Sequence, residues 1–201
     1  MSESASFFSD FVGPHPDVLW DASFLTPQLH DELFLFCQGL NWSVPEVNFH
    51  GRNIPVPREI LWFGDVEYRY SGIRHRAQAM PEALQSLAHR IEQWLAEQGV
   101  SERFNSVLMN RYRSGKDSIG MHSDNEEQLG ARPVIASVSL GAVRTFVFEH
   151  KLTGVRHREA LHPGSLLVMK GDCQEQWRHG IPKEPLAGER INLTFRRTQH
   201  P

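Results

Sequence analysis

The chain has 201 residues and a formal net charge of −3 at pH 7, with 40% hydrophobic and 22% charged residues. This size and composition fit one globular domain with a substantial core, and they exclude a disordered chain. The acidic balance argues mildly against a general nucleic-acid-binding protein.

Neither the apolar runs nor the cysteines indicate a membrane or an oxidising compartment. No run approaches the length that crosses a bilayer, and the N-terminus lacks the basic and then apolar pattern of a secretory signal. Cys37 and Cys173 are far apart, so neither a disulfide framework nor a thiolate zinc site is expected. We expect an intracellular monomer without membrane contact, cytoplasmic if bacterial, which we favour, and nuclear if eukaryotic.

The N-terminal part predicts an arm followed by helices. Residues 1–20 contain two prolines and no hydrophobic periodicity, which predicts a loosely packed arm ahead of a domain over 21–201. The Thr-Pro pair at 26–27 predicts the start of a helix that Gly39 ends. The clearest helix is predicted over 81–98, and its apolar face should cover the outside of a sheet.

Two hairpins are predicted between these helices. The stretch 42–57 is rich in proline, glycine and asparagine, with a possible hairpin tip at Phe49-His50-Gly51-Arg52. An exposed aromatic residue there could probe a partner, although Phe49 could equally be a buried strand residue. Strands at 60–63 and 66–70 predict a second hairpin around Gly64-Asp65.

The second half of the chain reads as a series of short strands separated by turn residues. This pattern after N-terminal helices predicts an α+β fold, a double-stranded β-helix (jelly roll) with the helices packed on one sheet. The expected strands are 106–112, 134–140, 145–149, 155–161, 165–169, 176–181 and 190–197.

A candidate metal site lies within this series. Residues two apart in an extended segment share a face, so Asn110 and Tyr112 point one way together and His122 and Asp124 do likewise. A third candidate ligand, His179, lies downstream. Two imidazoles and one carboxylate occupy one side of a metal and leave the other open, which suits a non-haem Fe(II) oxygenase, although the same set could hold zinc.

The last predicted strand carries a candidate anion site. Two guanidiniums on one half-buried face need anionic partners, and the planar fork of Arg190 suits the far carboxylate of a dicarboxylate. Asn110 and Tyr112 could add neutral hydrogen bonds. By alternation the polar face comprises Arg190, Asn192, Thr194 and Arg196, and the apolar face comprises Ile191, Leu193 and Phe195.

The order and spacing of these motifs resemble a known family. Asn-x-Tyr at 110–112, His-x-Asp at 122–124, the distal His179 and the block at 190–196 look like the AlkB family of Fe(II)/2-oxoglutarate-dependent nucleic-acid dealkylases. The likeness runs from about Phe49 to Arg197. Five further segments resemble the branch of this family that prefers double-stranded DNA: residues 56–58, 64–65, 68–72, 135–141 and 146–148.

The resemblance implies roles for the site residues. His122, Asp124 and His179 would hold Fe(II), while Arg190 would bind the distal carboxylate of 2-oxoglutarate. Arg196 would line the near end of the cosubstrate and also steady Asp124. The other residues expected around the cosubstrate are Asn110, Tyr112, Asn192 and Thr194.

The resemblance also implies a nucleotide-recognition region at about 44–76. Its hairpin tip would carry a wedge that fills the gap left by a flipped base, and alignment on 56–58 puts His50 rather than Phe49 at the wedge position. Tyr70 would stack on the base opposite His122, although the two tyrosines of this hairpin could equally form a cross-strand pair. The expected substrate contacts are Phe49, His50, Gly51, Arg52, Tyr68, Tyr70, Asn125 and Glu126.

The sequence therefore predicts an enzyme that uses Fe(II), 2-oxoglutarate and O2 to dealkylate N-alkylated bases in DNA, of the 1-methyladenine and 3-methylcytosine type. This reaction is direct-reversal DNA repair. Three alternatives stay open: the same chemistry on methylated RNA, on a protein side chain or small molecule, or a metal-binding module without redox turnover.

Overall fold

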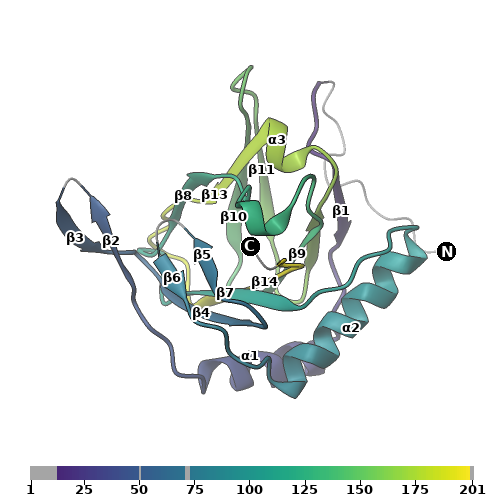
Figure 1. Cartoon of the computed structure of the whole chain (residues 1–201), viewed down its shortest axis with the longest axis horizontal. Helices are drawn as coiled ribbons and strands as arrows, with labels where there is room; N and C mark the ends of the chain where they lie inside the picture. Colours follow the sequence, from purple (N-terminus) through teal and green to yellow (C-terminus); the bar gives the residue numbers. More distant parts are fainter. Residues whose placement is uncertain (1–12, 50, 71–72, 200–201) are drawn as a thin grey trace.

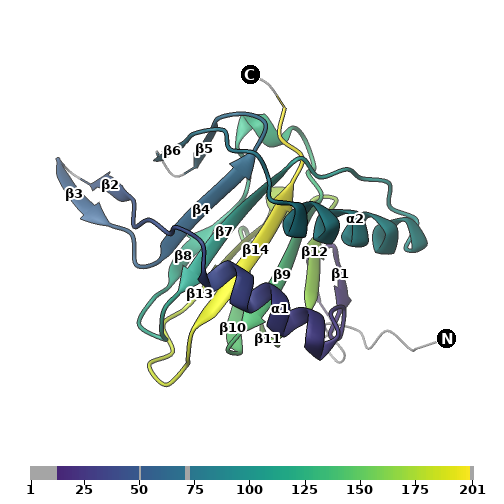
Figure 2. The ribbon, with the colours of Figure 1, turned by 90° about the horizontal axis from the view of Figure 1, so that it is seen from below.

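The computed structural model describes residues 13–49, 51–70 and 73–199, without the side chains at positions 49, 69, 70 and 73. Two antiparallel sheets face each other, and two helices cover the outer face of the larger sheet (Figures 1 and 2). The expected jelly roll with helices on one sheet is confirmed.

The larger sheet has six strands, in the order β1 (Val18–Asp21), β12 (Leu166–Met169), β9 (Ile135–Gly141), β14 (Arg190–Arg196), β7 (Ser106–Tyr112) and β4 (Glu59–Gly64). The smaller sheet has four, in the order β11 (Arg156–Leu161), β10 (Arg144–His150), β13 (Trp177–Ile181) and β8 (Ile119–His122). Two hairpins stand apart, β2 (Glu46–Phe49) with β3 (Arg52–Pro55) and β5 (Tyr68–Tyr70) with β6 (Ile73–His75).

The helices form where capping and periodicity predict them. In α1 (Pro27–Gln38) the Thr26 hydroxyl caps the first turn by accepting a hydrogen bond from the Leu29 amide at 3.3 Å. In α2 (Glu82–Glu97) one apolar face is buried against the six-stranded sheet. The short helices α3 (Cys173–Gln176) and η1 (Glu127–Leu129) were not expected. No helix in the described part of the chain is long and apolar enough to cross a membrane.

The alternation of side chains divides the interior into two layers. Ile191, Leu193 and Phe195 of β14 pack with the helices, while the polar residues of the same strand face the smaller sheet. A second apolar cluster fills the space between the sheets, with Trp62, Phe148 and Trp177 among its buried members. The polar face of β14 therefore lies inside the jelly roll, next to this second cluster.

Two expectations about the N-terminal half are wrong. Residues 18–21 form an edge strand paired with β12, with Val18 opposite Met169, where a loose arm was expected; residues 1–12 lie outside the described part. The hairpin around Gly64-Asp65 is also absent from the described chain, because β4 pairs with β7 and β5 pairs with β6. Both faces of β4 carry buried apolar residues, which suits a strand within the large sheet more than a hairpin arm.

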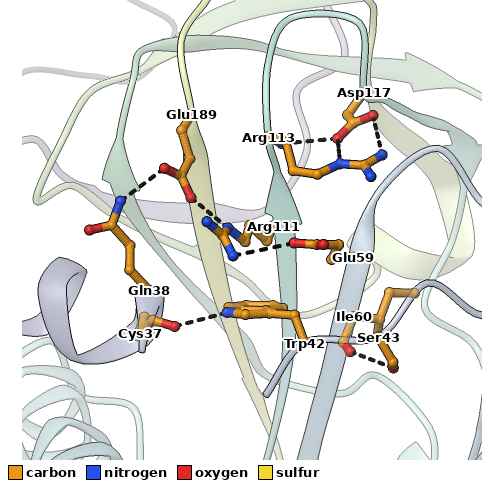
Figure 3. A network of polar contacts seen from close by, with 10 residues as sticks. All are labelled: Cys37, Gln38, Trp42, Ser43, Glu59, Ile60, Arg111, Arg113, Asp117 and Glu189. Atoms are coloured by element: carbon orange, nitrogen blue, oxygen red, sulfur yellow. Dashed lines mark hydrogen bonds and ion pairs between the residues drawn. The ribbon is translucent and has the colours of Figure 1, made fainter. Parts of the chain in front are cut away.

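A polar network ties the end of the larger sheet to α1 (Figure 3). Arg111 of β7 donates to Glu189 at 2.5 Å and lies 3.4 Å from a carboxylate oxygen of Glu59 on β4. Gln38 at the end of α1 donates to the second oxygen of Glu189 at 2.9 Å. This network fixes the entry into β14, directly before Arg190.

Two loops meet at the same end of the jelly roll. The Gly115 amide donates to Ala187 O at 2.8 Å, and the Glu184 amide donates to Gly115 O at 2.8 Å. A Cβ atom at position 115 would lie 1.5 Å from Glu184 O, so only glycine fits. The contact joins the β7–β8 loop to the β13–β14 loop.

Gly115→Ala should therefore lower the free energy of unfolding by about 1–3 kcal/mol, because the loops must separate to admit a methyl group. Gly120→Ala is the matched control, since nothing lies within 4 Å of a Cβ built there. Urea denaturation measures both. Equal midpoints for the two variants would contradict this loop contact.

Candidate active site

Three candidate metal ligands come together from distant parts of the chain. His122 ends β8, Asp124 follows two residues later, and His179 lies on β13 directly opposite His122 in the antiparallel register. The two imidazole centroids are 4.4 Å apart, and one ligand atom from each of the three residues lies within 4.8 Å of the others. This separation is small enough for a single ion.

The His122 imidazole is oriented by the backbone of its own strand. Its Nδ1 lies 2.9 Å from the Gly120 carbonyl, which can only accept, so Nδ1 carries the proton. The Nε2 atom is then unprotonated and can act as a ligand atom, and it lies 3.6 Å from Asp124 Oδ1. The backbone contact therefore selects the tautomer that can bind a metal.

The Asp124 carboxylate is buried and held from two directions. Its Oδ2 accepts a hydrogen bond from Arg196 Nη2 at 2.8 Å. The backbone amide of Asp124 donates to Gln174 Oε1 at 2.9 Å. Burial alone would raise the pKa of Asp124, but the positive Arg196 and the two imidazoles outweigh burial and lower this pKa to about 2. Asp124 is thus ionised, and its other oxygen, Oδ1, has no hydrogen-bond partner among the described residues.

His179 is buried as a neutral imidazole. Burial, followed by repulsion from His122, lowers the pKa of His179 to about 3. The ring of Phe146 stacks on it at a centroid distance of 5.2 Å. Its Nδ1 has no hydrogen-bond partner within the part of the chain that is described. A neutral imidazole is the form that binds metal ions.

Arg190 offers a buried cation without a carboxylate. Its Nη2 donates to Ser139 Oγ at 2.9 Å and to Asn192 Oδ1 at 2.7 Å, whereas Nε and Nη1 are buried without a hydrogen-bond partner in the described chain. Burial lowers the pKa of Arg190 to about 10, so the guanidinium stays charged at neutral pH. An uncompensated buried charge is costly, and an anion would offset that cost.

One cavity between the sheets contains both the candidate metal ligands and Arg190. The register places Asn192 opposite Asn110 and Arg190 opposite Tyr112, so the predicted cosubstrate residues of β7 and β14 face the same space. Its lining comprises Asn110, Tyr112, His122, Asp124, His179, Arg190, Asn192, Thr194 and Arg196, with Leu108, Ile119, Ser137, Phe146, Met169 and Ile181 as the remainder. All nine residues predicted to bind the metal or the cosubstrate therefore line one cavity.

Tyr68 lies outside this cavity lining, in the core. Its ring is fully buried and stacks on Trp62 at a centroid distance of 4.4 Å, and the Arg196 guanidinium carbon lies 6.0 Å above the same ring. Neither face is open to a base, so the prediction that Tyr68 contacts substrate is not supported by its position. Tyr68 instead supports Arg196, which in turn holds Asp124.

The other predicted substrate residues lie on the two hairpins, directly after the metal pair, or outside the described residues. Gly51 and Arg52 are exposed on the β2–β3 hairpin, while His50 lies outside the described residues. Asn125 is exposed and Glu126 is half-buried, directly after the metal pair. Burial and the nearby Asp124 raise the pKa of Glu126. Phe49 and Tyr70 belong to strands β2 and β5, but their side chains are not described.

Sequence reasoning missed three residues that support the site. Arg58 donates to Asn110 Oδ1 at 2.7 Å, Gln174 holds the Asp124 amide, and Arg144 is fully buried beside Tyr112. Two signals existed: alternation along β10 places Arg144 on the inward face with Phe146 and Phe148, and Arg58 lies in the segment 56–58 that resembles the family. The contacts of Arg58 and Gln174 depend on long-range pairing.

The unpaired atoms test whether a metal and an anionic cosubstrate fit. Asp124 Oδ1 and His179 Nδ1 are buried and have no hydrogen-bond partner in the described chain. The Nε and Nη1 groups of Arg190 are also buried without a hydrogen-bond partner there. A cation would satisfy Asp124 Oδ1, and an anion would offer acceptors to the Arg190 donors. The residues present therefore fit Fe(II) and 2-oxoglutarate.

Comparisons with known proteins agree with this chemistry. Residues 17–196 match the sequence model of the 2OG-Fe(II) oxygenase superfamily. The rat alpha-ketoglutarate-dependent dioxygenase alkB homolog 3 is 39% identical over 172 residues, which cover 80% of this chain and 56% of the relative. The Arabidopsis thaliana DNA oxidative demethylase ALKBH2 is 33% identical over 215 residues, which cover 92% of this chain and 67% of the relative.

The human DNA oxidative demethylase ALKBH2 is 34% identical over 167 residues, covering 77% of this chain and 62% of the relative. The solved structure of OsALKBH1 superposes with a TM-score of 0.67 at 18% identity, covering 92% of this chain and all of that one, which supports the fold. The chain spans about half to two thirds of the length of the curated relatives that it matches.

The two metal-ligand side chains of the His-x-Asp pair should differ in their effect on stability. Asp124→Ala leaves the buried Arg196 charge unpaired and should lower the free energy of unfolding of the metal-free protein by about 3–5 kcal/mol. His122→Ala removes a partly exposed ring and should cost less than about 1 kcal/mol. Denaturation in the presence of a chelator measures both, and Mn(II) titration should show lost binding in each. Equal stabilities would contradict the role of the Asp124–Arg196 pair.

Proposed function

The chain belongs to the AlkB family of 2OG-Fe(II) oxygenases, and we propose that it removes alkyl groups oxidatively from N-alkylated bases, of the 1-methyladenine and 3-methylcytosine type, in DNA. The observation that carries this proposal is one cavity that combines three metal ligands on one side with the two unpaired N–H groups of Arg190. A redox-inactive metal module would have no use for the second feature. The name of ALKBH2, a DNA oxidative demethylase, favours DNA as the substrate.

Iron in this site would supply the activation of O2, in a reaction that converts 2-oxoglutarate to succinate and CO2, places one oxygen atom on the N-methyl carbon and releases that carbon as formaldehyde. His122 Nε2, a ring nitrogen of His179 and Asp124 Oδ1 would hold the ion. Arg196 occupies Oδ2, so Asp124 presents a single oxygen to the metal. With three protein ligands, the ion would keep further coordination positions for the cosubstrate and O2.

The cavity walls orient the cosubstrate. The Nη1 group of Arg190, which has no hydrogen-bond partner in the described chain, would donate a charged hydrogen bond to the distal carboxylate. Tyr112 and Asn110 lie beside it on β7, and Thr194 and Asn192 on β14 line the same wall. Because these groups lie between two packed sheets, bulk water is excluded and the ion pair is strengthened.

The substrate would enter from the side of the two hairpins. The β2–β3 hairpin projects away from both sheets (Figures 1 and 2), and its glycine and arginine are exposed at the tip. A base in a duplex must leave the stack to reach a buried metal, and alkylated bases pair poorly, which lowers the cost of flipping. We propose Phe49 or His50 as the residue that fills the resulting gap, and Tyr70, Asn125 and Glu126 as contacts to the base.

Activity on lesion-bearing oligonucleotides tests the proposal. The wild-type protein with Fe(II) and 2-oxoglutarate should release formaldehyde and succinate from methylated DNA, and His122→Ala should release neither at a measurable rate. His89→Ala, on the exposed side of α2, is the control and should retain wild-type activity. Single-stranded DNA, duplex DNA and RNA with the same lesion are compared in one assay. Faster turnover of the RNA would refute the DNA assignment.

Anaerobic addition of Fe(II) and 2-oxoglutarate separates an oxygenase from a zinc-binding module. A visible charge-transfer band is expected in the wild type, because the 2-oxo acid chelates the iron through the open positions. The His122→Ala variant should show no such band. A colourless wild-type complex would argue for a metal site without redox function.

Arg190→Met should raise the 2-oxoglutarate concentration at half-maximal rate by about 10- to 100-fold, because a hydrogen-bonded charged contact contributes about 1.5–3 kcal/mol. The variant keeps a long apolar side chain, so the core stays filled. Arg156→Met, at an exposed position on β11, is the control. An unchanged dependence on 2-oxoglutarate would exclude the proposed ion pair.

A further inference from the structure

Arg144, at the start of β10, has a fully buried side chain that takes no part in the roles assigned above. We propose that Arg144 is a positioning residue for the cosubstrate pocket. It holds Tyr112 and two loops in place behind Arg190, so that Arg190 presents its free N–H groups to the distal carboxylate. The inference rests on the proposed use of 2-oxoglutarate.

The Arg144 guanidinium joins three parts of the chain. Its Nη2 donates to Asp117 O at 2.9 Å and to Pro182 O at 2.5 Å, and its Nε donates to Glu184 Oε2 at 2.9 Å. Asp117 lies in the β7–β8 loop, and the other two acceptors lie in the β13–β14 loop. One side chain thus ties together the loops that follow Tyr112 and precede Arg190.

The tied loops have little freedom of their own. Asp117 accepts hydrogen bonds from Arg113 N at 2.9 Å and Arg113 Nε at 2.8 Å, which closes the β7–β8 loop on itself (Figure 3). Gly115 forms two backbone hydrogen bonds with the β13–β14 loop, as described above. Arg144 is fully buried and donates hydrogen bonds to one carbonyl of each loop. An apolar residue at this position would leave both carbonyls without these hydrogen bonds.

The Tyr112 ring contacts the guanidiniums of both Arg144 and Arg190. The guanidinium carbon of Arg144 lies 5.4 Å from the centre of the Tyr112 ring, and that of Arg190 lies 5.5 Å from the same centre. Arg190 and Tyr112 are also direct neighbours across the β14–β7 register. A shift of the Tyr112 ring would therefore alter the wall against which Arg190 rests.

The charges around Tyr112 are not equivalent. Glu184 neutralises Arg144 and is itself held by the Thr145 amide at 3.0 Å and hydroxyl at 2.6 Å. Arg190 has no carboxylate within ion-pair distance in the described chain. We therefore expect the loss of Arg144 and the loss of the Glu184 charge to have different effects on the affinity for a bound diacid. Loss of Arg144 removes the anchor, whereas loss of the Glu184 charge keeps the anchor and leaves more positive charge nearby.

Calorimetric titration of the Mn(II)-loaded protein with 2-oxoglutarate under anaerobic conditions measures the affinity for the cosubstrate without turnover. Arg144→Met should weaken 2-oxoglutarate binding at least tenfold with unchanged Mn(II) affinity. It should leave binding of pyruvate, which has the 2-oxo acid group but no distal carboxylate, within twofold. Glu184→Gln should bind 2-oxoglutarate at least as tightly as the wild type. Arg156→Met on the exposed face is the matched control.

Arg144→Lys guards against a folding defect, because it keeps the buried charge but cannot reach all three acceptors. It should show the same loss as Arg144→Met. Wild-type affinity in either variant, or an equal loss for pyruvate, would overturn the positioning role. An equal loss in Glu184→Gln would overturn it as well. A wild-type protein that binds no 2-oxoglutarate would instead refute the proposed function itself.

Discussion

The ion pair between Asp124 and Arg196 is the contact on which the site depends. Both side chains are almost completely buried, and they come from opposite sheets, Asp124 from the segment after β8 and Arg196 from β14. Removing two charges from water is costly, and the cost is offset only when geometry and further hydrogen bonds are good. Tyr68 beneath Arg196 and Gln174 at the Asp124 amide supply that support. The pair thus fixes a ligand oxygen and joins the two sheets at once.

The cavity lining carries more positive charge than the net charge of the chain suggests, because it contains Arg190 and Arg196 but only one carboxylate, Asp124. Arg58, Arg144, Arg190 and Arg196 are each no more than 5% exposed. Asp124 neutralises one and Glu184 another. The lining guanidinium that no carboxylate neutralises is Arg190, which suits an anion bound next to a cation. A formal charge of −3 for the whole chain therefore says nothing about the ligand that the cavity takes.

Side-chain alternation predicted the site well because it depends only on strand geometry. It assigned Arg190, Asn192, Thr194 and Arg196 to one face, and the structure places all four in the cavity lining. What alternation cannot give is the partner of a strand. The Gly64-Asp65 signal marked the end of β4 correctly, but β4 pairs with β7, a strand more than forty residues away. For the same reason Tyr68 looked like a ligand contact, although its neighbour across space is Trp62.

The arrangement separates reaction chemistry from substrate choice. Every side chain proposed to bind the metal or the cosubstrate lies on a strand of the two main sheets or directly after one, where long-range hydrogen bonding holds the backbone. The proposed base contacts lie on the hairpins β2–β3 and β5–β6 or just after β8, outside both sheets. The hairpins share no ladder hydrogen bonds with the strands that carry the metal ligands, so changes in them leave those strands paired. That is why the metal and cosubstrate residues are readable from strand motifs, whereas periodicity does not encode the roles of the exposed residues proposed to contact the base.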